Sequence, residues 1–250
     1  MNNNEVTSLF KYRPVNEFTL DILANERIYF PKADMFNDPY DTEYFVTDKN
    51  ETISEKECGE VVDAYPECSG LDSDSIDRVV TDVNGKIKDI ITNSGILSLS
   101  RDASNLLLWA HYADDHKGVC IEFERNEYNL LGNDGATKQV IYTKSYPSFS
   151  KVDFTKNEVF NVVQKILWTK SVDWSYEEEW RVIVSKGGIV NDIPGKIKSI
   201  TFGLRCSSMS MDIIKKLVEG KNIQLRQAEK LTSEYGINFR NITSIPPVSG

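Results

Sequence analysis

The chain has 250 residues and a net charge of −9, with an isoelectric point near 4.9. Hydrophobic residues make up 40% and aromatic residues 10%, which is enough to fill a core, so a disordered chain is excluded. This length suits one domain or at most two. The acidic balance disfavours nucleic acid and anionic membranes as partners, because binding to either usually needs a basic surface.

Targeting signals and cysteine motifs are the next features to consider. The segment Met1–Glu5 is polar, and the longest apolar runs, such as Leu106–Ala110, are far shorter than the roughly 20 residues of a membrane helix. We therefore expect a cytoplasmic protein without a membrane anchor. No C-x-x-C pair occurs, so we expect free thiols and no structural zinc site. The cysteines are Cys58, Cys68, Cys120 and Cys206.

The N-terminal part of the chain mixes short strands with helices. Apolar residues at alternating or helical spacing, with prolines and capping residues at their ends, define the elements. In chain order, they are a strand at 8–13, a helix at 17–25, a strand at 27–30, a turn at 37–41 and helices at 54–64 and 73–91. The segment from about 47 to 93 is acidic and polar, so we expect it to be a helical insertion on one side of the domain.

The remainder continues this irregular alternation. The predicted elements are a strand at 95–100, a helix at 105–113, strands at 118–123 and 138–142, a helix at 157–169, strands at 179–184 and 197–202, a helix at 211–217 and a strand at 223–228. Neither a βαβ rhythm nor a glycine-rich phosphate loop is present. We predict an α+β fold with a mostly antiparallel mixed sheet and flanking helices, in a single main domain over 1–250 with a loose tail at about 244–250.

Two charged clusters lie in the first fifty residues. Lys11, Tyr12 and Arg13 end the first strand, where a forked guanidinium suits a phosphate or a carboxylate. Asn37 and Asp38 open the predicted turn, which is suited to present carboxylates from a rigid loop. Each cluster also has a structural explanation, as solvated charges on an edge strand and as an Asx turn.

A third cluster contains both histidines of the chain. His111 and His116 are five residues apart, about 140° around a helix, whereas two metal ligands on one face need a spacing of three or four. A metal site is therefore disfavoured. His111 is expected to act as a base or as a hydrogen-bond donor to a ligand, or to be a satisfied histidine near the core. Trp109 and Tyr112 are candidate ligand-binding residues beside it.

The fourth cluster places three acids at the start of an apolar strand. In an extended segment Glu177 and Glu179 share one face, and Glu178 lies on the other. Carboxylates beside a β-sheet core cost desolvation unless cations such as Arg181 or Arg13 pair with them. Both a functional site and a structural ion pair explain this arrangement.

The four clusters together carry a resemblance to a known family. In this order, K-Y-R-P, F-N-D-P-Y-D, L-W-A-H-Y-A-D-x-H-K-G-V-C-I-E-F and Y-E-E-E-W-R resemble the bacterial domain of unknown function 2971 family. The match runs from about Leu9 to Ile183, with a looser continuation to about Ile242. The family name implies no activity.

The chain is also similar, more distantly, to ADP-ribosyltransferase-like domains. Those domains carry a cation or histidine on an early strand, an S-x-S strand and an E-x-E entering a further strand. Here Lys11 or Arg13, then Ser98 with Ser100, then Glu177 to Glu179 fill these places. The resemblance implies NAD as cofactor, bound in a cleft between sheets. It implies that Glu179 bonds the nicotinamide ribose and stabilises an oxocarbenium-like transition state, that Glu177 orients the acceptor, and that the cation holds phosphate or ribose.

Three functions remain open from the sequence. The first is an ADP-ribosyltransferase-like enzyme that modifies a macromolecule or a small acceptor, in phage defence or a toxin-like role. The second is a non-catalytic module that binds a nucleotide or a protein. The third is a metal-dependent hydrolase or nuclease that uses Asp38, Asp41 and the acids near Glu179 with magnesium. In each case we predict that Arg13, Asp38, His111 and Glu179 surround one cleft.

Overall fold

The computed structural model describes residues 6–49, 51–155 and 159–242. Its centre is an eight-stranded sheet with the strand order β14-β13-β12-β5-β1-β4-β10-β6. Neighbouring strands are antiparallel, apart from the parallel pair β12–β13. This confirms the predicted α+β fold with a mostly antiparallel mixed sheet.

The strands of this sheet are β1 (Ser8–Arg13), β4 (Gly95–Ser100), β5 (Val119–Glu124), β6 (Thr137–Gln139), β10 (Glu179–Val184), β12 (Ile197–Phe202), β13 (Gln224–Lys230) and β14 (Ile237–Asn241). Three two-stranded sheets pair β2 (Arg27–Phe30) with β11 (Ile189–Asp192), β3 (Phe45–Val46) with β8 (Ser148–Phe149), and β7 (Ile141–Thr143) with β9 (Thr169–Ser171). The helices are α1 (Glu17–Asn25), α2 (Glu55–Ala64), α3 (Ser73–Asn93), α4 (Leu106–Tyr112), α5 (Val159–Leu167) and α6 (Ser208–Leu217).

Most predicted strands have the observed bounds within a residue or two, but the strand predicted at 138–142 is wrong. It is two strands, since the chain changes partner at Val140. The amide of Val140 donates to the carbonyl of Glu179 at 2.9 Å, while the amide of Ile141 donates to Trp168 at 2.7 Å. The first residues of the helix predicted at 157–169 and the tail predicted at 244–250 lie outside the described residues.

The two faces of the large sheet are covered differently. On one face, α1 and α6 pack over a core that includes Leu23, Trp180 and Ile214. On the other face, α4 crosses β1, and Trp109 meets the edge of the Tyr12 ring at 5.2 Å. The site described below opens beside α4, at the boundary between this smaller core and the rest of the sheet.

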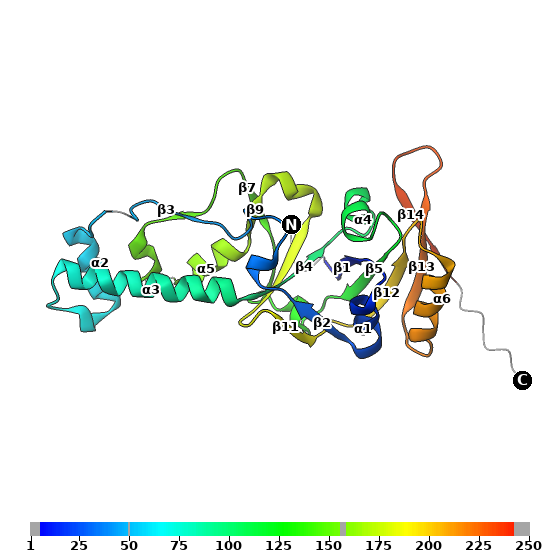
Figure 1. The fold of residues 1–250 in the computed structure, drawn as a ribbon, viewed down its shortest axis with the longest axis horizontal. Helices are drawn as coiled ribbons and strands as arrows, with labels where there is room; N and C mark the ends of the chain where they lie inside the picture. The colour runs from blue at the N-terminus through cyan, green and yellow to red at the C-terminus, as the bar shows by residue number, and fades with distance from the viewer. Residues whose placement is uncertain (1–5, 50, 156–158, 243–250) are drawn as a thin grey trace, which may run out of the picture.

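A helical arm extends from the end of the sheet that carries β4 and β10 (Figure 1). It contains α2 and α3, in the segment predicted as a helical insertion, and α5 packs beside α3. Lys151, nearly buried, ties the arm together by donating to Asp77 at 2.5 Å. Among the described residues, no helix combines the length and the apolarity needed to cross a membrane.

Candidate functional site

The large sheet opens between β1 and β4. These strands share a single register pair, Phe10↔Ser100. Earlier in β4, the amide of Ile96 does not pair with β1 and donates to the carbonyl of Pro31, at 2.9 Å. The carbonyl of Ser98 lies between these two contacts and accepts from Lys11 Nζ at 2.7 Å. A side-chain ammonium therefore replaces the backbone pairing at this point of the sheet.

A cavity of about 570 Å³, called here the cleft cavity, lies at this opening. Side chains from distant parts of the chain line it. The C-terminal ends of β1, β4 and α4 meet the start of β10 there. The predicted site residues in its lining are Lys11, Tyr12, Arg13, Asn37, Ser98, Ser100, His111, Tyr112, Glu177 and Glu179. The structure thus brings residues of all four sequence clusters to one place, the second cluster through Asn37 and Asp41.

Three predicted residues lie elsewhere. Asp38 lines a neighbouring cavity, and its Oδ1 accepts from the Tyr40 amide at 2.9 Å, which is the Asx turn. Asp38 thus lies beside the cleft cavity, while Asn37 and Asp41 of the same cluster line it. Trp109, expected to bind ligand, is fully buried in the core, with its indole N–H bonded to the carbonyl of Ala103 at 2.9 Å. Arg181 is fully buried beneath the cavity.

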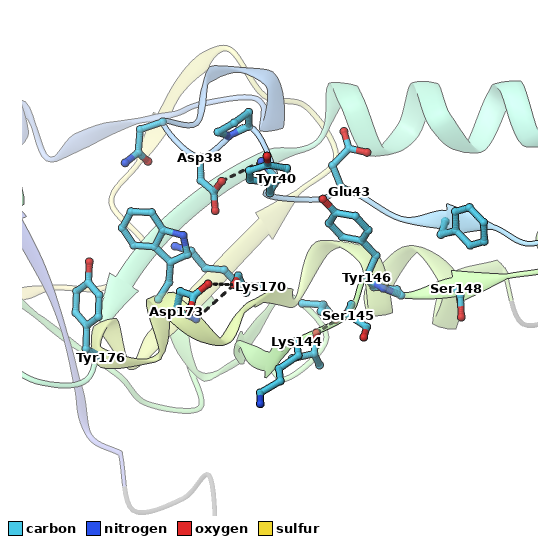
Figure 2. Close-up of a pocket in the computed structure, with 18 residues that line it drawn as sticks. Asp38, Tyr40, Glu43, Lys144, Ser145, Tyr146, Ser148, Lys170, Asp173 and Tyr176 are labelled. Atoms are coloured by element: carbon cyan, nitrogen blue, oxygen red, sulfur yellow. Dashed lines mark hydrogen bonds between the residues drawn. The ribbon is translucent and has the colours of Figure 1, made fainter.

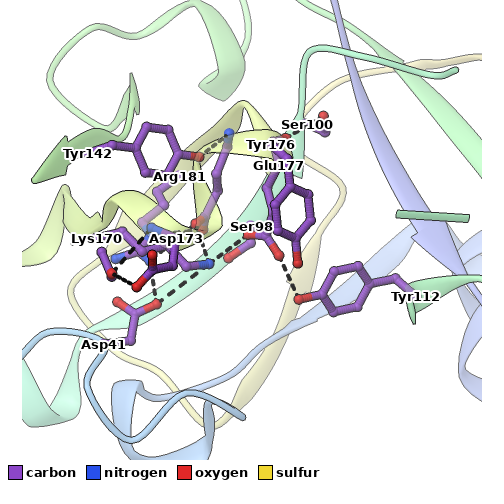
Figure 3. Close-up of polar contacts among 12 residues, drawn as sticks. Asp41, Ser98, Ser100, Tyr112, Tyr142, Lys170, Asp173, Tyr176, Glu177 and Arg181 are labelled. Carbon is purple, nitrogen blue, oxygen red and sulfur yellow. Dashed lines mark hydrogen bonds and ion pairs between the residues drawn. The ribbon is translucent and has the colours of Figure 1, made fainter. Parts of the chain in front are cut away.

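Arg181 binds two carboxylates under the cavity floor (Figure 3). Its Nε donates to Glu179 Oε1 at 2.8 Å, and its Nη2 donates to Asp41 Oδ2 at 2.6 Å. Its Nη1 donates to the carbonyl of Leu167 at 2.8 Å. A buried guanidinium with its charge shared between two acids fixes the loop of Asp41 against the start of β10.

Lys170 joins the second glutamate to this network. Its Nζ lies 2.6 Å from Glu177 Oε2 and 2.9 Å from Glu179 Oε2. The other oxygen of Glu177 accepts from the Tyr112 hydroxyl at 2.7 Å, so α4 is tied to the same carboxylate. Ser100 holds the backbone here, since its hydroxyl donates to the carbonyl of Glu177 at 2.7 Å.

The three consecutive glutamates do not form the extended segment expected from the sequence. A 3₁₀ helix over Val172–Glu177 ends at Glu178, which adopts a left-handed conformation with φ of 44°, and β10 begins at Glu179. Glu177 and Glu179 still point to one ammonium, because the turn carries Glu178 away from it. Glu178 forms an ion pair with Arg101 instead, and 41% of its side chain is exposed.

The carboxylates differ in their electrostatics. Burial raises the pKa of Glu179, but Arg181 and Lys170 outweigh this effect and lower the pKa to about 2. Burial also raises the pKa of Asp41, and there Arg181 does not fully offset it. Glu179 is therefore a permanent anion, while Asp41 is held less firmly in its charged form.

The cations differ in the same way. Burial, together with the charge of the neighbouring Arg13, lowers the pKa of Lys11 to about 8. Burial acts against the charge of Lys170 too, but Glu179 and Glu177 raise its pKa above the ordinary value. Lys11 is thus mostly charged at neutral pH and loses its proton above about pH 8, whereas Lys170 remains charged.

A second cavity of about 1000 Å³, called here the aromatic cavity, adjoins the first and shares Asn37 and Lys170 with it (Figure 2). Tyr40 and Tyr146 stack in it, with ring centroids 6.5 Å apart. Trp174 lies over Lys170, whose ammonium is 5.1 Å from the ring centre. Tyr146 and Lys170 were not predicted as site residues, since they come from a loop and from the three-residue strand β9, neither of which has a repeating pattern.

The acids of this region are arranged as partners of cations and not as a metal site. Within 6–49, 51–155 and 159–242, no three His, Cys, Asp or Glu side chains are grouped in a way that could hold a metal ion. Asp41 and Glu179 each face Arg181, so the strongest acids of the site are already opposed by a fixed positive charge.

Comparison with known proteins gives one match. Searches of curated proteins and of solved structures return none. The matched segment runs from α4 to β10 and contains Tyr112, Lys170, Glu177, Glu179 and Arg181. Residues 108–182 are similar to the family described as protein of unknown function (DUF2971), which supports the resemblance to that family over this part of the chain.

Proposed function

We propose that the protein is an ADP-ribosyltransferase-like enzyme that binds NAD in the cleft cavity and transfers ADP-ribose to an acceptor. One observation supports this above the others. The strands that carry the cation, the S-x-S and the E-x-E, β1, β4 and β10, are consecutive in the sheet although they come from opposite ends of the chain. The sheet opens where they meet, and Lys11, Ser98 and Glu179 line the same cavity.

The charges of the cavity suit the parts of NAD. Lys11 and Arg13 provide two cations for its diphosphate, on the β1 side of the opening. Glu179 provides a fixed negative charge on the β10 side, where its low pKa keeps it ionised throughout the physiological range. A preorganised anion placed against a developing positive charge stabilises an oxocarbenium-like transition state.

The reaction would break one bond and form another at the same carbon. The bond between C1′ of the ribose and the nicotinamide nitrogen breaks, and nicotinamide leaves with the electron pair. A lone pair of the acceptor then bonds to C1′, and the acceptor loses one proton. Glu177, held by Tyr112 and Lys170 beside Glu179, would orient the acceptor.

A second function, a non-catalytic nucleotide-binding module, is favoured by one specific observation. Both carboxylate oxygens of Glu179 already accept hydrogen bonds, from Arg181 and from Lys170. In such a module the anion would support the architecture of the cavity, and a nucleotide would bind there without being consumed. The two functions therefore differ in turnover, not in binding.

The test measures binding and turnover on the same proteins. NAD at a hundred times its dissociation constant should stabilise the fold by about 2.7 kcal/mol, which a thermal melt detects, and ATP and magnesium serve as comparison ligands. Glu179→Gln should lower nicotinamide release by a factor of about 10²–10³ while NAD still stabilises the variant. Glu178→Gln is the matched control and should retain activity, since Glu178 turns away to Arg101.

Each outcome selects a different conclusion. Stabilisation by NAD without nicotinamide release would favour the binding module. Equal release by the wild type and Glu179→Gln would remove the catalytic role of Glu179. Absence of both stabilisation and release would contradict the proposed NAD site.

A further inference from the structure

Lys170 occupies the junction of the two cavities and lines both of them. Its side chain is only 8% exposed, and its ammonium contacts Glu177 at 2.6 Å, Glu179 at 2.9 Å and Asp41 at 3.9 Å. Trp174 covers it on the side of the aromatic cavity. A buried ammonium that contacts three carboxylates needs an explanation beyond surface charge, because its desolvation is expensive.

The contacts divide unequally between the two cations of the network. Arg181 donates to Glu179, to Asp41 and to the carbonyl of Leu167. Glu177 forms its ion pair with Lys170 and accepts a hydrogen bond from the Tyr112 hydroxyl. Lys170 is therefore the group that brings the carboxylate of Glu177 next to that of Glu179.

We propose that Lys170 is a positioning residue of the cleft cavity, which holds the carboxylates of Glu177 and Glu179 side by side and neutralises their mutual repulsion. This rests on the proposed function, in which the two carboxylates have separate roles and must both carry charge. Without a cation between them, two adjacent carboxylates share a proton, because like charges at short distance disfavour double ionisation. The pair would then lose one of its two roles at moderately acidic pH.

The ionisable groups around Lys170 determine which other side chains could contribute to the pH profile. The ionisable groups that face it are Glu177, Glu179, Asp41, Arg181, Tyr112, Tyr142 and Tyr176, and burial raises the pKa of Tyr176. Burial raises the pKa of both Tyr112 and Tyr142, so neither ionises near neutral pH. Lys11 lies further off, and its pKa of about 8 predicts an alkaline limb in the pH profile of every variant. A new acid limb therefore comes from the carboxylates that contact Lys170, and removing Glu177 as well distinguishes the pair from Asp41.

The test compares Lys170→Met and Lys170→Arg with Lys144→Met, a control that removes an exposed lysine from the aromatic cavity. Nicotinamide release from NAD is measured from pH 5 to pH 9. We expect Lys170→Met to gain an acid limb, in which release falls about tenfold for each pH unit below the pKa of the pair, because the fully ionised fraction falls by that factor. Lys170→Arg and Lys144→Met should keep the wild-type profile.

A purely structural role gives a different result. In that case Lys170→Met melts at a lower temperature but keeps the shape of the wild-type pH profile, and the proposal is overturned. If Lys170→Met does not fold, the double variant with Glu177→Gln removes the facing carboxylate as well. It should fold and show no acid limb, whereas an acid limb in the double variant would contradict the proposed positioning role of Lys170.

A second measurement does not depend on NAD. In Lys170→Met the carboxylate pair should have a pKa above its unfolded value, so it contributes stability at low pH that is lost as the pH rises through that pKa. The free energy of unfolding of Lys170→Met should therefore fall, relative to Lys170→Arg, between pH 5 and pH 8. If the free energy of unfolding of the two variants changes in parallel with pH, the proposed positioning role of Lys170 is wrong. If the curves diverge while the wild type neither binds NAD nor releases nicotinamide, Lys170 does position the two carboxylates and the proposed function fails.

Discussion

Two glutamates are buried in the same sheet in very different ways. Glu122, on β5, accepts from the hydroxyls of Ser8 at 2.8 Å and Ser199 at 2.5 Å. Its cations, Lys198 and Arg226, lie 3.4 and 3.3 Å away, with 43% and 27% of their side chains exposed. Neutral hydroxyls and cations that remain partly hydrated are enough to accommodate this acid.

Glu179, on β10, is held by charges that are themselves buried. Lys170 and Arg181 have side-chain exposures of 8% and 0%. Removing two cations from water costs far more than turning two hydroxyls inward. Since Glu122 shows that this sheet can bury an acid with hydroxyls and solvated cations, the fold alone does not demand the second arrangement. The extra cost marks the start of β10 as a site where charge is needed.

Among the substitutions that test this contrast between the two glutamates, Arg181→Met should lower the free energy of unfolding most. It leaves Asp41 and Glu179 without their guanidinium, and breaking a buried pair in this way costs about 3–5 kcal/mol. Chemical denaturation monitored by tryptophan fluorescence measures the loss. Arg27→Met, which removes an exposed ion pair with Asp21, is the control and should leave the midpoint nearly unchanged. A loss below about 1 kcal/mol for Arg181→Met would show that the buried network carries little of the stability.

The pH dependence of stability separates the two glutamates further. The folded pKa of Glu179, about 2, lies below its ordinary value of 4.5, so its contribution is full above pH 4.5 and is lost as the pH falls toward 2. The stability difference between the wild type and Glu179→Gln should shrink by roughly 3 kcal/mol between pH 6 and pH 2. Subtraction is needed, since Asp41, with its raised pKa, contributes with the opposite sign. A difference that stays constant with pH would contradict the ion-pair assignment.

Glu122→Gln should have the smallest effect. The amide keeps the shape, and its oxygen can accept from one of the two serine hydroxyls while its N–H donates to the other, so we expect a loss of about 1 kcal/mol in the free energy of unfolding. Lys198 remains hydrated when the carboxylate is gone, which limits the penalty. Urea denaturation at pH 7 measures this, with Glu179→Gln alongside. If Glu122→Gln is the more destabilised of the two, the contrast between the glutamates is reversed.

Much of the central sheet could be predicted from the sequence, because its strands alternate apolar and polar residues. β1, β4 and β10 have the predicted bounds, and the clusters at their ends meet as strand ends of one sheet do. The side of the site formed by β7 and β9 could not be predicted. These are three-residue parallel strands, and their pairing depends on tertiary contacts without a pattern of their own.

The details of the site depended on single backbone conformations. The left-handed turn at Glu178 sends that side chain away from Lys170, and no local pattern marks it, since glutamate seldom adopts positive φ. In the loop before β3, Asp41 enters the buried network while Asp38 caps a turn. The sequence offers two acids three residues apart and does not distinguish them, because the choice is made by the position of Arg181.

The opening between β1 and β4 creates an edge in the interior of a sheet. Exposed edges invite pairing with strands of other chains, and proteins commonly guard them with an inward-pointing lysine. Lys11 has this geometry, since its ammonium binds the Ser98 carbonyl that a neighbouring strand would otherwise use. The same residue to which the proposed function assigns a ligand phosphate thus occupies a backbone acceptor that an added strand would need. Removing its charge would convert an entrance for a small molecule into a place where an extended polypeptide can add to the sheet.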